Sequence, residues 1–158
     1  MAMALKIRED RRDVTQEDKG TGQYLSFILG EEVFALNLTN SKEILTPQLI
    51  TGLPRSADYV LGVINLRGKI VPVLDLKKEL NLSSSYSGEH DKRIIIITIE
   101  DVQLGIMVDA VNEVITVNNN DIQRLSDYDR SISNDYIDGV VEIDEQLLVL
   151  ININKLVF

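Results

Sequence analysis

One segment of this chain occurs twice, and the repetition limits the possible folds more than any other feature. Asp58-Tyr-Val-Leu-Gly-Val63 recurs 77 positions later as Asp135-Tyr-Ile-Asp-Gly-Val140, and the match continues without a gap. Earlier in the chain, residues 34–38 match residues 104–108 at a spacing of 70. Agreement in order, polarity and turn position over such lengths predicts an internal duplication. Because the two spacings differ by seven, we expect a longer connection between Thr116 and Asp135 in the second copy.

Strand signals dominate both copies, since short β-branched segments alternate with Gly, Asn, Asp and Glu-Glu breaks. The segments are 24–29, 33–38, 60–66, 70–76, 93–99, 102–108, 111–117, 140–143 and 147–153. We therefore predict an all-β fold in which each copy supplies five strands, with short helical turns within 75–80, 121–135 and 152–158. Five short strands close into a small barrel, and a barrel of this size needs a packing partner. Two barrels packed side by side are the expected architecture.

The pattern also predicts the order of parts along the chain. Residues 1–22 are expected to be a disordered segment, 23–82 a first barrel, 83–91 a linker and 92–158 a second barrel, with terminal strands able to cross between barrels. The last hairpin of the first copy turns at Arg67-Gly68-Lys69, whereas Asp144-Glu145 occupies that turn in the second copy, so a different turn geometry is expected there. Pro72 cannot donate to a strand ladder, so it is placed at an edge or a bulge.

Charge and composition exclude several classes of function. The net charge is −9, and residues 81–158 hold the whole excess, with five basic against 14 acidic residues. Such a field repels phosphate backbones and anionic lipid, so nucleic acids and membrane surfaces are not expected partners. No apolar run approaches the roughly 20 residues that span a bilayer, and there is no cysteine. We expect a cytoplasmic protein without membrane insertion.

The sequence offers little catalytic chemistry. The only histidine, His90, follows a serine-rich stretch and is expected to lie in a loop. No nucleotide-binding loop, zinc-ligand spacing or nucleophile elbow occurs, so no cofactor, metal or enzymatic activity is expected. Glu43, Asp75, Asp109 and Glu113 are expected to face outward from strands and turns. A hydrolase built on Glu43, Asp109 and Glu113, or a small-molecule-binding barrel, is the alternative.

The hairpin around Arg67 is the most suggestive surface feature. Val63, Ile64 and Leu66 lie beside its tip, and arginine is enriched at protein interfaces. Arg67 could equally have a structural role, either capping the turn or pairing with a nearby acid. The sequence leaves the binding role and the structural role open.

The stretch Gly62-Val-Ile-Asn-Leu-Arg-Gly68, followed by Ile70-Val-Pro-Val-Leu-Asp75, resembles the most recognisable motif of the CheW family of chemotaxis coupling proteins. Comparable segments extend the resemblance from about residue 23 to 158: Gln23-Tyr-Leu-Ser-Phe-Ile-Leu-Gly30, Lys42-Glu-Ile44, Gly105-Ile-Met-Val-Asp109 and Leu147-Leu-Val-Leu-Ile-Asn152. The resemblance implies two SH3-like five-stranded barrels. It also implies a non-enzymatic adaptor, monomeric alone, that links the cytoplasmic tips of methyl-accepting chemoreceptors to the regulatory domain of the histidine kinase CheA within larger receptor clusters.

The resemblance further implies which residues bind partners. Glu43 matches a glutamate implicated in receptor binding, and Arg67 matches the motif arginine, whose role is structural as much as contacting. The remaining motif candidates are Gly62, Asn65, Leu66 and Gly68. A groove for receptor helices would be lined by Leu38, Val108 and Val111, and Ser41 stands where the family often has an apolar residue beside it.

An alternative within the same fold is a coupling domain of another two-component pathway, of the kind joined to a response-regulator receiver. The 158 residues show no receiver-like α/β pattern, which favours the simpler adaptor.

Overall fold

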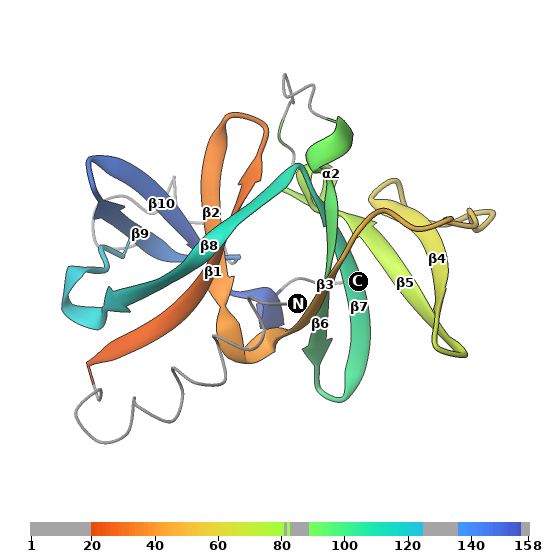
Figure 1. Cartoon of the computed structure of the whole chain (residues 1–158), viewed down its shortest axis with the longest axis horizontal. Coiled ribbons are helices and arrows are strands. Elements are labelled where there is room, and N and C mark those ends of the chain that lie inside the picture. The colour runs from red at the N-terminus through yellow and green to blue at the C-terminus, as the bar shows by residue number, and fades with distance from the viewer. Residues whose placement is uncertain (1–19, 81, 83–88, 125–135, 156–158) are drawn as a thin grey trace. The chain divides into compact units, whose positions relative to one another are not determined.

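The computed structural model describes residues 20–80, 82, 89–124 and 136–155 and consists mainly of strands, as Figure 1 shows. Its strands are β1 (Thr21–Leu29), β2 (Glu32–Asn37), β3 (Ser41–Leu45), β4 (Val60–Leu66), β5 (Lys69–Asp75), β6 (Arg93–Ile99), β7 (Val102–Val108), β8 (Ala110–Asn118), β9 (Ile137–Ile143) and β10 (Gln146–Ile151). The helical elements are α2 (Leu76–Glu79) and the 3-10 turns Leu38–Asn40, Glu89–Asp91, Asn119–Asp121 and Ile153–Lys155. The predicted all-β class is confirmed. The expected turn within 121–135 lies mostly outside the described residues.

The ten strands form two five-stranded sheets whose orders correspond strand by strand. One sheet has the order β8-β1-β2-β10-β9 and the other the order β3-β6-β7-β5-β4. The first sheet combines the hairpin β1–β2 of the first copy with β8, β9 and β10 of the second copy, and the other sheet combines the hairpin β6–β7 of the second copy with β3, β4 and β5 of the first.

This exchange of hairpins makes the two compact units discontinuous in sequence. Unit 1 comprises the described parts of 1–26, 33–39 and 112–158, and unit 2 comprises 27–32 and 40–111. The sequence predicted two continuous segments in which only terminal strands cross between barrels. Instead, the whole hairpins β1–β2 and β6–β7 pair with strands of the other copy. In addition, β1 begins at Thr21, inside the segment expected to be disordered; the rest of that segment, 1–19, lies outside the described residues.

Backbone pairing reproduces the duplication residue by residue. In one sheet Ala35 of β2 lies opposite Leu150 of the parallel strand β10, and in the other Gly105 of β7 lies opposite Val73 of the parallel strand β5. Ala35 and Gly105 are 70 positions apart, and their partners Val73 and Leu150 are 77 apart. The two spacings found in the sequence thus correspond to the two hairpins that each sheet combines.

The repeated glycine allows a connecting segment to pass directly against a strand. Gly62 has a φ of 144°, and a Cβ there would lie 2.2 Å from the Thr51 carbonyl oxygen. A Cβ on its counterpart, Gly139, would lie 2.6 Å from the Gln123 carbonyl oxygen. Thr51 bridges to Val63, the residue after Gly62, in the same antiparallel manner in which Gln123 bridges to Val140. Only glycine lets the backbones approach this closely.

In unit 2 the sheet curls around its own apolar core. Ile64 of β4, Val71 and Val73 of β5, and Ile94 and Ile96 of β6 form one buried cluster, although β4 and β6 are not neighbours in the sheet. Burying aliphatic side chains of this size contributes about 1.5–3 kcal/mol each. Their convergence on one interior is what a small barrel requires.

Two expectations about β4, β5 and their counterparts need correction. Asp144 and Glu145 have φ values of 52° and 66°, in the same left-handed region as Arg67 at 51°, so the two hairpin turns are similar rather than different. The twist of a two-residue hairpin demands this conformation whatever the residue type. Pro72 lies in an internal strand, but it pairs only with Val63, because the pairing of β5 with β7 begins at Val73.

Candidate functional site

The candidate site lies at the turn between β4 and β5, where local hydrogen bonding fixes the backbone. Arg67 and Gly68 form the turn, and both have positive φ. The Asn65 side-chain oxygen accepts a hydrogen bond from the Gly68 amide at 2.9 Å. Asn65 therefore orients the turn, and this bond keeps the Arg67 side chain at the tip of the hairpin.

Arg67 forms a two-pronged contact with Glu43 of β3. One guanidinium nitrogen is ion-paired with Oε1 of Glu43, and the other donates to Oε2 at 3.4 Å. The hydrogen bond to Glu43, and then its negative charge, raise the pKa of Arg67. The Arg67 side chain is 70% exposed and that of Glu43 is 17% exposed. The structure thus shows the pairing with a nearby acid, and contact of Arg67 with a partner stays a prediction.

The other motif candidates have different surroundings. Gly62 is buried beneath Thr51, and Leu66 packs against the core cluster of unit 2, so both support the hairpin from inside. Gly68 is exposed, and nothing lies within 4 Å of the position that a Cβ would take. Ile70 of β5 is 65% exposed, an aliphatic side chain in water two residues past Gly68.

The expected groove lining is only partly accessible. Leu38 and Val108 are 2% and 0% exposed, so they are core residues and cannot offer a contact surface. Their apolar character indicated burial as much as binding. Val111 and Ser41 are half-buried, so part of each side chain is reachable. Within this set, Val111 and Ser41 are the residues that a partner could touch.

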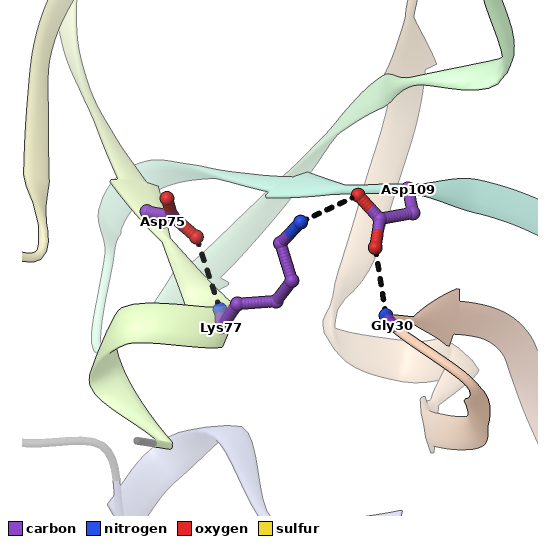
Figure 2. Close-up of polar contacts among 4 residues, drawn as sticks. All are labelled: Gly30, Asp75, Lys77 and Asp109. Carbon is purple, nitrogen blue, oxygen red and sulfur yellow. Dashed lines mark hydrogen bonds and ion pairs between the residues drawn. The ribbon is translucent and has the colours of Figure 1, made fainter. Parts of the chain in front are cut away.

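Asp109 was expected to face outward, but it is almost fully buried, with 1% of the residue exposed. Figure 2 shows its two carboxylate oxygens pointing at different partners: Oδ1 accepts from Lys77 Nζ at 2.9 Å, and Oδ2 accepts from the Gly30 amide at 2.7 Å. Asp75 caps the start of α2 by accepting a hydrogen bond from the Lys77 amide at 3.1 Å. The sequence did not predict Lys77 and Gly30 as partners of Asp109, because they lie 32 and 79 positions away from it along the chain and no local pattern links them.

The carboxylates proposed for a hydrolase do not form an acid–base pair. Glu43 is paired with Arg67 and Asp109 with Lys77, while Glu113 is exposed and its main-chain oxygen accepts from Ser26 Oγ at 2.9 Å. Within residues 20–80, 82, 89–124 and 136–155, no three His, Cys, Asp or Glu side chains group as a metal site would require. His90 is exposed and lies on the turn Glu89–Asp91, in line with the loop expectation.

The fold and the site define a duplicated, two-sheet all-β protein that carries its family motif on an exposed, ion-paired hairpin. The chain belongs to the CheW-like domain family, whose model matches residues 23–157. It is thus a chemotaxis coupling protein of the scaffold type. No helix in the described part of the chain is both long and apolar enough to span a membrane.

Named relatives support this assignment. The chemotaxis protein CheW of Bacillus subtilis (strain 168) is 35% identical over 141 residues, which cover 89% of this chain and 90% of that protein. CheW of Treponema pallidum (strain Nichols) is 33% identical over 137 residues, 85% of this chain and 81% of that protein. The crystal structure of the scaffolding protein TtCheW from Thermoanaerobacter tengcongensis matches with a TM-score of 0.77 and 32% identity, covering 85% of this chain and 91% of that one.

Proposed function

We propose that this protein is a non-catalytic adaptor that couples the cytoplasmic tips of chemoreceptors to the regulatory domain of the kinase CheA. The observation that carries the proposal is the CheW-like match over residues 23–157, with the family motif on an exposed hairpin tip. Coupling requires only that two partners be held together. Two of the three carboxylates considered for catalysis are already engaged in ion pairs, in keeping with a binding role.

The hairpin tip has the chemistry of a protein-binding surface. Arg67 is mostly exposed yet fixed in place by Glu43, so little side-chain freedom is lost when a partner contacts it. Exposed Lys69 and the 65% exposed Ile70 follow it on β5. An ordered arginine beside an aliphatic side chain is typical of an interface that binds protein. We assign this tip and Glu43 as the main contact residues.

The duplication supplies unlike surfaces for unlike partners. The turn that is Arg67-Gly68 in unit 2 is Asp144-Glu145 in unit 1, with the same backbone conformation but opposite charge. Ile70 and its counterpart Leu147 are both exposed, at 65% and 57%. Similar shapes with opposite charge favour different partners. This asymmetry suits an adaptor, which is recruited from the cytoplasm to membrane-bound receptor clusters.

Co-sedimentation tests the proposal. The purified chain is mixed with a chemoreceptor cytoplasmic fragment and CheA from the same genome, and the pelleted fractions are measured for the native protein and for the Arg67→Ala variant. We expect the native chain to pellet with both partners and Arg67→Ala to pellet less. A Lys42→Ala variant, which removes an exposed cation beside Glu43, is the control for a general loss of positive charge. Equal pelleting of kinase with and without the native chain would reject the proposal.

A further inference from the structure

The buried charge pair between Asp109 and Lys77 is not explained by the adaptor function, and it joins three separate stretches of unit 2. Lys77 lies on α2, Asp109 follows the end of β7, and Gly30 is at the tip of the β1–β2 hairpin. A main-chain bond supplements the side-chain contacts, because the Asp109 amide donates to the Ile28 carbonyl oxygen at 3.0 Å. One carboxylate thus connects the hairpin tip to the helix, as Figure 2 shows.

The other copy of the repeat is built without this pair. Asp109 corresponds to Thr39 at the spacing of 70, and Lys77 corresponds to Asn154 at the spacing of 77, and both counterparts are uncharged. The capping contact, in contrast, is kept: Asn154 donates its amide to Asn152 Oδ1 at 3.1 Å, as Lys77 does to Asp75. Unit 1 therefore forms the same strand plan and helical turn without an ion pair at this position. The pair of Asp109 and Lys77 must have a role that is specific to unit 2.

What is particular to unit 2 is the hairpin tip itself. Residues 27–32 belong to unit 2, although the chain on either side, up to Ser26 and from Val33 to Thr39, belongs to unit 1. Gly30 has a φ of 63°, and its amide is held by Asp109 at 2.7 Å. Glu31 and Glu32 beside it are exposed, whereas Phe27 and Leu29 of the same segment are 0% and 1% exposed. The polar bond to Asp109 therefore holds the turn at Gly30, and apolar packing holds the strand that leads into it.

We propose that Asp109 and Lys77 form a latch that holds the β1–β2 tip on unit 2, and that the latch opens as a local transition while the sheets stay folded. A buried ion pair adds little net stability compared with apolar packing, but removal of one partner leaves an uncompensated buried charge and is strongly destabilising. The Lys77 side chain is 17% exposed, so water reaches one side of the pair and opening requires no global unfolding.

Residue-resolved amide hydrogen exchange on the full chain tests the latch. We expect the Gly30 and Asp109 amides of the native chain to exchange with a smaller opening free energy, and a weaker dependence on urea, than the amides of β6 and β7. Lys77→Met should speed exchange of the Gly30 and Asp109 amides by at least about tenfold. Lys78→Met, one residue along the same helix and exposed, is the matched control and should leave the tip unchanged. Asp109→Asn, which keeps an oxygen for the Gly30 amide, should produce a smaller increase and serves if Lys77→Met does not fold.

Two results would overturn the latch. In the first, the Gly30 amide exchanges at its native rate in both Lys77→Met and Asp109→Asn, which would mean that other contacts hold the tip. In the second, the Gly30 and Asp109 amides of the native chain exchange with the same opening free energy and urea dependence as the amides of β6 and β7, which would make the pair part of the global core.

Discussion

The guanidinium of Arg67, at the tip of the β4–β5 hairpin, is ion-paired with the carboxylate of Glu43 on β3, and these two residues join opposite ends of one sheet. In the order β3-β6-β7-β5-β4, the strand of Glu43 is first and the hairpin of Arg67 is last. The pair therefore spans the seam where the curled sheet of unit 2 meets itself. Because Arg67 is also mostly exposed, one contact both links the two ends of the sheet and leaves the motif arginine accessible to solvent.

Removing either member of this pair should weaken assembly more than folding. Exposed ion pairs contribute little to stability, so Arg67→Ala and Glu43→Ala should melt close to the native protein while associating less with receptor and kinase. Thermal melting and co-sedimentation on the same samples separate the two effects. Lys78→Ala, which removes an exposed lysine on α2, controls for charge alone. A lower melting temperature with association intact would show that the role of Arg67 is structural.

Replacing Gly62 with alanine should destabilise the protein by about 3 kcal/mol or more, since the new Cβ meets the Thr51 oxygen and the φ of 144° is disfavoured for L-residues. Gly139→Ala should act in the same direction through the Gln123 oxygen. Gly52→Ala, with nothing within 4 Å, should change stability by less than about 0.5 kcal/mol. Urea denaturation measures all three, and equal stability of Gly62→Ala and Gly52→Ala would contradict the close approach.

The buried pair of Asp109 and Lys77 should show strong coupling. Lys77→Met leaves the Asp109 carboxylate buried without its cation and should cost about 3 kcal/mol, whereas adding Asp109→Asn to it should recover part of that loss. A double-mutant cycle from denaturant unfolding gives the coupling energy. Additive effects of the two substitutions would show that the 2.9 Å contact has no energetic weight.

Tyr24 of β1 should limit stability at alkaline pH. Burial raises its pKa above 10.0, the charge of Asp138 raises it further, and Arg124 lowers it. The fold favours the neutral phenol, so this contribution is intact below pH 10 and is lost as the pH rises through the higher pKa of the folded state. We expect Tyr24→Phe to become less destabilising relative to the native protein over the range from pH 10.0 to the higher pKa of the folded state. A difference in unfolding free energy that stays constant across that range would refute this assignment.

The sequence predicts the strand plan because the repeat appears twice with the same order of polar, apolar and turn residues. It does not predict the exchange of hairpins between sheets, since β2 and β10 pair across more than 100 residues and local patterns contain no record of that choice. The left-handed turn at Asp144-Glu145 was missed for a different reason. Hairpin twist imposes that conformation on residues that do not prefer it.

For the candidate site, the family resemblance located the hairpin and Glu43 but did not show that the two are paired. Arg67 and Glu43 come from different strands, and only the curling of the sheet brings them together. Burial was the weakest prediction: Leu38 and Val108 look like surface aliphatics by resemblance, yet both are core residues, and Asp109 looks exposed by type, yet it is buried with a cation. Polar burial depends on a partner distant in sequence, which a single sequence does not reveal.

Kinase activity in a reconstituted complex tests the central claim most directly. CheA autophosphorylation is measured with a chemoreceptor fragment from the same genome, with and without this protein, and with Arg67→Ala in its place. The adaptor account predicts that receptor control of the kinase appears only when the native chain is added and is reduced with Arg67→Ala. Kinase activity and receptor–kinase association that are the same with and without the protein would contradict it.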